Sequence, residues 1–379
     1  MKVFQSKAAN AEELARSLEV VPGLQLALVF GPPQLLKDPG LLAALQLAMP
    51  GAILGGCSTA GEITAEGIGE DSLVVTGVGF DQVRAAFALT DLAGMPDSWE
   101  AGKRLGEGIR AEGLRAVLLF GQGVAINGSA VIEGLQSVIG ASIPITGGLA
   151  GDGARFMETV VFTPQGASSQ ALMAIGLYGS GLRISHGSFG GWETFGTLRK
   201  VTKSAGNVLC ELDGRRALDI YKEYLGDYAK DLPSSGLLFP FEMVDRQQGS
   251  TGVIRTILAI DEAAGSLTLA GAIDPEGYLQ LMHASTDRLI DGAEAAAEAA
   301  RSMKAHPGEA LALLVSCVGR KLVMGERVDE EIEAVAGVFG PQTVLAGFYS
   351  YGEISPSAPG ASCQLHNQTM TVTWISEQA

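Results

Sequence analysis

Residues 26–64 read LALVFGPPQLLKDPGLLAALQLAMPGAILGGCSTAGEIT. They contain an apolar run (26–31), an amphipathic helical pattern, a second short apolar run and a glycine-rich turn that leads to Glu62. A strand, a helix and a strand in this order favour a parallel strand pair joined by a right-handed crossover. These residues therefore predict one strand–helix–strand unit of an α/β protein.

This unit occurs three times along the chain. LALVFG (26–31) matches AVLLFG (116–121) at an offset of 90, and the same offset pairs Ala60-Gly61-Glu62 with Ala150-Gly151-Asp152. A looser third copy, over residues 311–355, begins with LALLVSC and ends with AGFYSYGEIS. Three copies with the same order of elements indicate a repeated supersecondary unit.

The segments after the turns, at 71–80, 157–165 and 365–375, have the composition of strands. Such strands predict antiparallel neighbours, and hence mixed sheets. We therefore expect an α/β fold of two domains built from repeated strand–helix–strand units with mixed sheets. The boundary is predicted near residue 210, which gives an N-terminal domain over 1–210 and a C-terminal domain over 211–379.

The composition excludes several classes of partner. The chain has 379 residues, and 26 Lys and Arg against 42 Asp and Glu give a net charge of −16. This acidic balance makes nucleic acid an unfavourable partner and opposes binding to an anionic membrane surface. The 51 glycines are about twice the usual ~7% of residues, and they gather at the turns that end each unit.

Targeting signals and cysteine usage both favour the cytoplasm. The N-terminal residues lack the apolar core of a signal peptide, and Pro50 breaks the most apolar stretch, 41–57, well short of a membrane span. The four cysteines lie far apart without a CxxC pair: Cys57, Cys210, Cys317 and Cys363. This pattern predicts reduced, largely buried thiols in a cytoplasmic protein.

Four motifs together carry a resemblance to a known family. In chain order they are GGCSTAGEI (55–63), ELDGRRALDIYKEYLG (211–226), GFYSYGEI (347–354) and LHNQT (365–369). The chain resembles the FIST proteins, which have a FIST N-terminal domain and a FIST C-terminal domain. The resemblance implies a sensory module of prokaryotic signal transduction that binds a small ligand such as an amino acid. It also implies a separate signalling partner, a histidine kinase or a cyclic-di-GMP enzyme.

The glycine-rich turns have the chemistry of a ligand site. Successive backbone N–H groups in such a turn form a concavity suited to a carboxylate, and Glu62 or Glu353 adds a negative charge for an ammonium group. The predicted ligand-binding residues are Cys57, Ser58, Thr59, Gly61, Glu62, Ser350, Tyr351, Gly352, Glu353, His366 and Asn367. The alternative is structural, because both glutamates could instead accept hydrogen bonds within their own turns.

Two other functions remain open from the sequence. Some stand-alone FIST relatives resemble haem-binding nitric-oxide sensors, and His186 or His366 could supply the axial ligand. An enzyme could use Cys57 as a nucleophile, although no GxSxG, GxxxxGK[ST] or HExxH motif is present. Cys363 and His366 do not predict a zinc site, since residues three apart on a strand face opposite sides. We therefore expect a sensor rather than an enzyme, with no metal and no certain cofactor.

Overall fold

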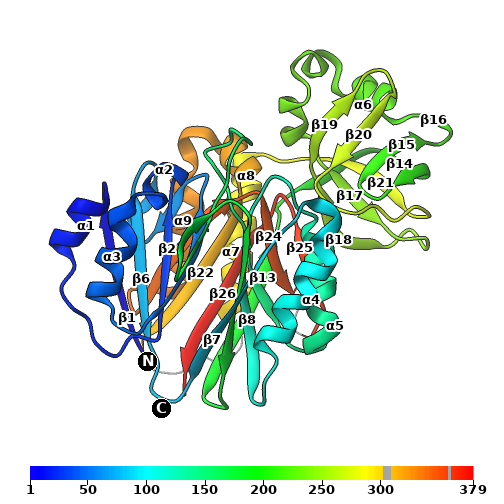
Figure 1. Cartoon of the computed structure of the whole chain (residues 1–379). Coiled ribbons are helices and arrows are strands. Elements are labelled where there is room, and N and C mark those ends of the chain that lie inside the picture. The colour runs from blue at the N-terminus through cyan, green and yellow to red at the C-terminus, as the bar shows by residue number, and fades with distance from the viewer. Residues whose placement is uncertain (302–308, 357–359, 379) are drawn as a thin grey trace.

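The computed structural model describes residues 1–301, 309–356 and 360–378. It is a mixed α/β structure with a larger body and a smaller one (Figure 1). The larger body contains three sheets of six strands each, and the smaller body is built on one antiparallel sheet system. The predicted α/β fold with mixed sheets is confirmed.

The larger body consists of three units with the same topology. In the first unit the elements are β1 (Lys2–Ala8), α1 (Ala11–Ser17), β2 (Leu26–Gly31), α2 (Pro33–Leu36), α3 (Pro39–Ala48), β3 (Ile53–Ser58), β4 (Glu62–Thr64), β5 (Gly67–Gly69) and β6 (Leu73–Gly79). In the second they are β7 (Arg84–Asp91), α4 (Ser98–Ile109), β8 (Leu114–Gly121), α5 (Gly128–Ile139), β9 (Ile145–Leu149), β10 (Val161–Thr163), β11 (Gly166–Ser168) and β12 (Ala171–Tyr178). Each unit is thus longer than the predicted repeat, because a strand and a helix precede it.

The third unit is interrupted by the smaller body. Its own elements are β13 (Leu182–Phe189), α7 (Thr286–Arg301), β22 (Ala310–Cys317), α8 (Val318–Met324), α9 (Asp329–Phe339), β23 (Thr343–Ser350), β24 (Gly352–Pro356), β25 (Cys363–His366) and β26 (Met370–Glu377). The insertion follows β13 and contains β14 (Glu193–Ala205), β15 (Val208–Leu212), β16 (Arg215–Arg216), α6 (Ala217–Leu225), β17 (Phe241–Val244), β18 (Ser250–Arg255), β19 (Ile257–Asp261), β20 (Ser266–Leu269) and β21 (Tyr278–His283). The sheet of the third unit therefore takes strands from both sides of residue 210, and the domain boundary there stays a prediction.

The three units exchange strands in a ring. In each unit the central pair, β2–β3, β8–β9 or β22–β23, is parallel. The strand after each turn leaves its own unit: β4 pairs with β23, β24 pairs with β9, and β10 pairs with β3. This exchange closes the larger body into three interlocked sheets, so no unit has a complete sheet alone.

Local sequence explains the elements that form the units. The central strands β2 and β22 are buried along their whole length, which is why they read as continuous apolar runs without alternation. Asn10 and Asn127 accept backbone N–H groups at the starts of α1 and α5, as N-cap residues do. The aromatic rings of Phe30, Phe120 and Phe348, one from each unit, meet in the shared core at centroid distances of 4.8 to 6.3 Å.

In each parallel pair, a glycine at the equivalent position lets the two backbones approach closely. A Cβ atom on Gly56 would lie 2.0 Å from the carbonyl oxygen of Val29, and one on Gly147 or Gly347 would lie 2.2 or 1.9 Å from an equivalent oxygen. No side chain fits at these positions, since the two backbones are in direct contact. Part of the glycine excess is therefore a requirement for close packing next to the turns.

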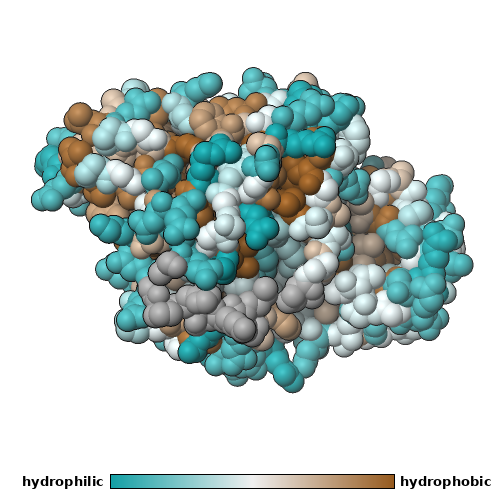
Figure 2. Space-filling view, turned by 90° about the horizontal axis from the view of Figure 1, so that it is seen from below, coloured by the Kyte–Doolittle hydropathy of each residue, from teal (hydrophilic) through white to brown (hydrophobic). Residues whose placement is uncertain are grey.

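The chain termini and the smaller body are found at different ends of the larger body. The chain termini lie at one end of the larger body, and the smaller body lies near the other end (Figure 1). Figure 2 views the end with the termini, where hydrophilic residues are interspersed with separate hydrophobic areas. Among the described residues, none of the helices has the length and apolar character needed to cross a membrane.

Candidate functional site at the three turns

The three glycine-rich turns meet at the end of the larger body that lies opposite the chain termini. Each turn follows the second strand of a parallel pair, which is β3, β9 or β23. A backbone N–H of each turn donates to a carbonyl of the next, from Ala60 to Tyr349 (2.8 Å), from Tyr351 to Leu149 (3.1 Å) and from Gly151 to Ser58 (2.8 Å). The turns therefore form one hydrogen-bonded ring, which places residues from distant parts of the chain side by side.

In the first turn, Glu62 is held by two hydroxyl groups. Thr59 Oγ1 donates to Glu62 Oε1 at 2.5 Å, and Ser72 Oγ donates to Oε2 at 3.0 Å. The Glu62 side chain is 1% exposed. Burial raises the pKa of its carboxyl group, and the two hydroxyl donors lower it by less, so the net shift is upward.

The third turn repeats this arrangement around Glu353. Ser350 Oγ donates to Glu353 Oε1 at 2.8 Å, and Oε2 accepts the backbone N–H of Thr369 at 3.1 Å and its hydroxyl at 3.0 Å. Glu353 is fully buried, and burial raises its pKa to about 8. At neutral pH this carboxyl group is therefore largely protonated, unlike an ordinary glutamate.

The second turn lacks the arrangement because it is shifted by one residue. The N–H of Gly151 takes the position that Ala60 and Tyr351 take in the other turns, which corresponds to an offset of 91 from the first turn rather than 90. The predicted pairing of Glu62 with Asp152 is therefore wrong. Gly153 stands at the position of the carboxylate, because the helical connection before β9 is one residue longer.

Asp152 instead closes the loop that follows its turn. Its carboxylate accepts the backbone N–H groups of Phe156 (2.8 Å), Met157 (2.8 Å) and Glu158 (2.9 Å), and the hydroxyl of Tyr351. Burial alone would raise the pKa of Asp152, but these donors more than offset that effect and hold it below its ordinary value. The predicted ligand-binding set omitted this residue, although the repeat alignment already marked its position as acidic.

A cavity of about 240 Å³ opens beside the first turn, and we call it the turn cavity. Its wall combines segments of all three units: Pro32, Gln34, Thr59, Ala60, Gly61, Glu62, Glu70, Asp71, Asp152, Gly153, Arg155 and Lys321. Lys321 Nζ donates to the carbonyl of Ala60 at 2.7 Å and pairs with Glu70. The cavity is thus polar and carries charges of both signs.

Two family models match the sequence, the FIST N domain over residues 25–215 and the FIST C domain over residues 217–356. This chain belongs to the FIST family. FIST domains are associated with small-ligand sensing in signal transduction. The suspected family is therefore confirmed.

Other comparisons add little to this FIST assignment. No curated protein matches the chain in sequence. A solved structure of cyanuric acid hydrolase from A. caulinodans aligns over 100% of this chain and 99% of its own, with 10% identity and a TM-score of 0.38. A likeness at that level carries no argument about the activity of this protein.

The predicted site residues of this FIST protein divide between several places. Thr59, Gly61 and Glu62 line the turn cavity. Ser58 is buried and accepts the N–H of Val160, while Ser350, Gly352 and Glu353 lie buried in the third turn. Tyr351 stacks on Phe156 at a centroid distance of 4.2 Å. The turns lie side by side, but the first and third do not share one ligand cavity.

Cys57 lies in the hydrophobic core rather than in a site. Its side chain is 0% exposed on β3, where its Cα is in register with Phe30 and Val161. Burial raises the pKa of the thiol well above its ordinary value, so it carries almost no thiolate at neutral pH. All four cysteines are free thiols, and Cys317 and Cys363 are buried as well. These surroundings do not favour a nucleophile at Cys57.

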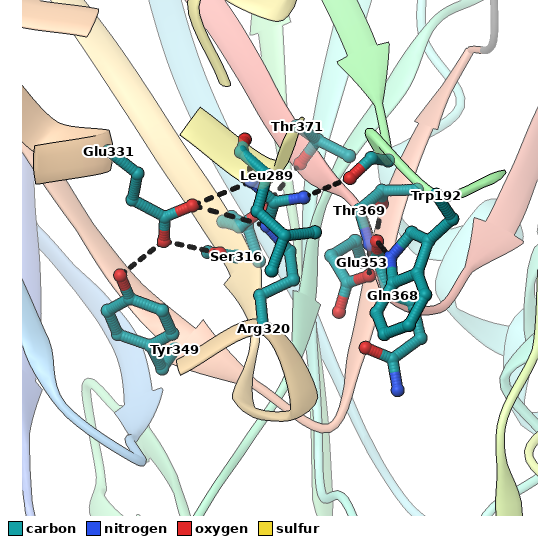
Figure 3. Close-up of polar contacts among 12 residues, drawn as sticks. Trp192, Leu289, Ser316, Arg320, Glu331, Tyr349, Glu353, Gln368, Thr369 and Thr371 are labelled. Carbon is teal, nitrogen blue, oxygen red and sulfur yellow. Dashed lines mark hydrogen bonds and ion pairs between the residues drawn. The ribbon is translucent and has the colours of Figure 1, made fainter. Parts of the chain in front are cut away.

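A buried ion pair supports the third turn from behind. Arg320 and Glu331 are both 0% exposed, with 2.7 Å between Arg320 Nη2 and Glu331 Oε2. Figure 3 shows that Ser316 and Tyr349 donate to the same carboxylate, while the guanidinium also reaches the carbonyl of Leu289. No sequence motif marks this pair, because Arg320 on α8 and Glu331 on α9 are eleven positions apart in the chain.

The two histidines considered for haem lie on β13 and β25, outside the wall of the turn cavity. His366 Nε2 bonds to the carbonyl oxygen of Ser355 at 2.9 Å, and its Nδ1 is buried without a partner in the described chain. His186 Nδ1 lies 3.3 Å from the hydroxyl of Thr373. Burial lowers the pKa of both to about 4, and neither lines the turn cavity. Asn367 is buried next to His366 in sequence and does not line that cavity either.

In the parts of the chain that the structure describes, no group of three or more His, Cys, Asp or Glu side chains could hold a metal ion. We derive no chemistry from haem or from a metal for this protein. The groups that the turns present to a ligand are hydrogen-bond donors, hydrogen-bond acceptors and charged side chains.

Proposed function

We propose that this FIST protein is a sensor that binds an amino acid, or a similarly small zwitterion, in the turn cavity. One observation carries this proposal: among the described residues, the cavity wall holds one charge of each sign that has no counter-charge. Asp71 and Arg155 are both exposed side chains, and within the described residues neither forms an ion pair. Asp71 Oδ1 accepts a long hydrogen bond from Gln34 Nε2, at 3.4 Å. A zwitterion needs one partner of each kind.

The other charges around the cavity are already engaged. Glu62 accepts two hydroxyl groups, and Asp152 accepts three backbone N–H groups and a hydroxyl. Lys321 pairs with Glu70. These residues therefore shape the cavity, and the ligand charges fall to Asp71 and Arg155. In this proposal Asp71, and not Glu62 as the sequence suggested, binds the ammonium group of the ligand.

The chemistry of the two free groups matches the two ends of an amino acid. A guanidinium forms paired hydrogen bonds with a carboxylate, and Arg155 already has its Nε bonded to the carbonyl of Asp152 at 2.7 Å, which limits its rotation. The Asp71 carboxylate can accept an ammonium group. A volume of about 240 Å³ suits one small molecule rather than a peptide or a nucleotide.

Binding at this place offers a route for the signal. The cavity joins Gln34 of the first unit, Arg155 of the second and Lys321 of the third. A ligand that contacts several units changes the free energy of their mutual packing, which is what a sensor must do to alter a surface elsewhere. We propose that the output passes to a separate protein, a histidine kinase or a cyclic-di-GMP enzyme, as in the family resemblance.

The proposal is tested by isothermal titration calorimetry of the full chain with each of the common amino acids. We expect at least one to bind, and we expect Asp71→Asn and Arg155→Gln each to weaken that binding about tenfold to a hundredfold. The size follows from the loss of one charged hydrogen-bond partner, worth about 1.5–3 kcal/mol.

Matched controls lie at the far end of the second unit. Glu112 and Arg115 are exposed charges at the start of β8, remote from its turn. Glu112→Gln and Arg115→Gln should leave the affinity unchanged. The proposal is wrong if no amino acid binds, or if Asp71→Asn and Arg155→Gln bind it as tightly as the unmodified chain.

A further inference from the structure

The loop over residues 153–158 follows the second turn and has a strained backbone. Gly153, Ala154 and Phe156 all have left-handed φ angles, of 71°, 65° and 55°. Glycine adopts this conformation freely, but a residue with a Cβ atom does so at a cost, and the conformation is least common for a bulky side chain. Ala154 and Phe156 therefore keep this backbone only because contacts with other segments hold the loop.

Tyr351 of the third turn bridges the residue before this loop and a residue inside it. Its hydroxyl donates to the Asp152 carboxylate and accepts the backbone N–H groups of Asp152 and Phe156, each at 3.2 Å. Its ring stacks on that of Phe156 at a centroid distance of 4.2 Å and an angle of 17°. The Asp152 carboxylate also accepts the N–H groups of Met157 (2.8 Å) and Glu158 (2.9 Å). The hydroxyl of Tyr351 thus has its donor and both acceptor positions occupied by this one segment.

Arg155 is the charged residue of this loop that lines the turn cavity. Its neighbours on both sides, Ala154 and Phe156, are the two strained residues, so the loop backbone fixes where its side chain begins. Its Nε donates to the carbonyl of Asp152 at 2.7 Å. Tyr351 is not part of that cavity wall. An effect of Tyr351 on a ligand in the turn cavity would therefore pass through Asp152 and the loop.

We infer that Tyr351 is a positioning residue of the proposed amino-acid site, because it holds Arg155 where the guanidinium can bind the ligand carboxylate. The inference rests on the proposed function and gives a role to a side chain that lies outside the cavity. A group that is ordered before binding loses less conformational entropy when the ligand arrives. The Tyr351 hydroxyl thus raises the affinity for the carboxylate end of the ligand without touching it.

A purely structural role of Tyr351 makes a different prediction. Loss of its hydroxyl would then disturb the cavity as a whole and weaken the binding of every compound there by a similar factor. A positioning role acts through Arg155 alone. It therefore weakens the binding of amino acids but spares their carboxamides, which keep the ammonium group and lack the carboxylate.

The binding test repeats the calorimetric panel at pH 7 with each amino acid and its carboxamide. We expect the unmodified chain to prefer the amino acid by about tenfold, and Tyr351→Phe, which keeps the stacked ring, to reduce that preference about fivefold. In an Arg155→Gln background, Tyr351→Phe should cause no further reduction. Tyr221→Phe removes a buried hydroxyl that is bonded to the carbonyl of Phe239 in the smaller body. It is the matched control and should retain the full preference.

A second measurement tests the hold on the loop without any ligand. Trypsin cleaves after arginine, and Arg155 is exposed, so the cleavage rate of the bond between Arg155 and Phe156 reports how firmly the loop is held. Under native conditions Tyr351→Phe should raise this rate about tenfold, whereas Tyr221→Phe should leave it unchanged. Phe156→Leu, at a position that is 37% exposed, removes the stacked ring and should act in the same direction as Tyr351→Phe. It keeps the inference testable if Tyr351→Phe does not fold.

Three results with Tyr351→Phe would overturn the inference. They are an unchanged cleavage rate, an unchanged preference for the amino acid, and an equal loss of affinity for the amino acid and its carboxamide. These results differ from failure of the proposed function, in which no amino acid binds or Arg155→Gln binds it as tightly as the unmodified chain. If the proposed function fails in that way, this inference is wrong as well.

Discussion

The first and third turns place a glutamate in the same frame of hydroxyl groups, yet the two carboxyl groups lie in different environments. Thr59, Glu62 and Ser72 in the first turn correspond to Ser350, Glu353 and Thr369 in the third. Glu62 borders the turn cavity, whereas Glu353 is fully enclosed and has a pKa of about 8.

The difference comes from what lies behind each turn. Leu35 and Arg320 occupy equivalent positions in the two units. Each comes six residues after the residue whose carbonyl faces the close-packed glycine, Val29 in the first unit and Leu314 in the third. Arg320 is buried against Glu331 and also reaches the carbonyl of Leu289. The glutamate and its hydroxyl partners therefore border a cavity in the first unit, whereas a buried polar network closes the corresponding space in the third.

The largest effect is expected when the third unit is made to resemble the first. Arg320→Leu should lower the free energy of unfolding by about 3–5 kcal/mol, because it leaves Glu331 buried without its cation. The double variant Arg320→Leu with Glu331→Leu should recover much of that loss. Urea unfolding monitored by circular dichroism measures both.

The control for this prediction is an exposed pair. Lys230 and Asp227 are 78% and 94% exposed, so Lys230→Leu should leave the stability unchanged within error. If Arg320→Leu is equally harmless, the buried pair does not distinguish the two turns and the comparison fails.

The next effect is a pH dependence that belongs to the third turn. The pKa of Glu353 is raised from an ordinary value of 4.5 to about 8 in the folded chain, so between these values the folded state binds a proton that the unfolded state has lost. Its contribution to stability is therefore full below pH 4.5 and falls as the pH rises to 8, by up to about 1.4 kcal/mol per pH unit.

Glu353→Gln removes this slope, since the amide stays neutral throughout. Measured as the difference from the unmodified chain at each pH, the variant should gain in relative stability from pH 5 to pH 8. The difference is needed because His186 and His366, with pKa values lowered to about 4, make the chain more stable as the pH rises from 4 to 6.5. A flat difference would show that Glu353 is ionised at neutral pH.

The smallest effect concerns the hydroxyl donors themselves. Thr59→Ala and Ser350→Ala each remove the hydrogen bond to one carboxyl oxygen, at a cost of about 1–2 kcal/mol at pH 7. At pH 9 the cost of Ser350→Ala should rise, because Glu353 is then ionised and the lost bond is charge-assisted. Ser137→Ala, on the exposed face of α5, is the control. Costs indistinguishable from this control would mean that the hydroxyl frame is not stabilising.

Much of the repeated unit could be predicted from the chain alone. The buried runs at 26–31 and 116–121 form β2 and β8, and each has a parallel partner as expected. Local patterns suffice here, because a buried parallel strand needs a continuous apolar run and each close approach of two backbones needs a glycine.

The candidate site was harder to predict. The charges proposed to bind the ligand, Asp71 and Arg155, lie outside the glycine-rich motifs, and no local pattern distinguishes them from other surface charges. The one-residue shift that moves Asp152 out of line with Glu62 arises in the helical connection, where the sequence match is weakest. Residues distant in the chain become one cavity only after the units exchange strands.

The sequence by itself determined the α/β class, the three copies and the acidic turns, because periodicity, glycine spacing and charge act within a few residues. The tertiary structure alone decided which acid borders a cavity, which is fully enclosed and which accepts the N–H groups of the loop that follows it. Those properties depend on burial and on partners contributed by other units. Glu62 and Glu353 have nearly the same neighbours in sequence, and only their packing gives one of them a cavity and the other a pKa of about 8.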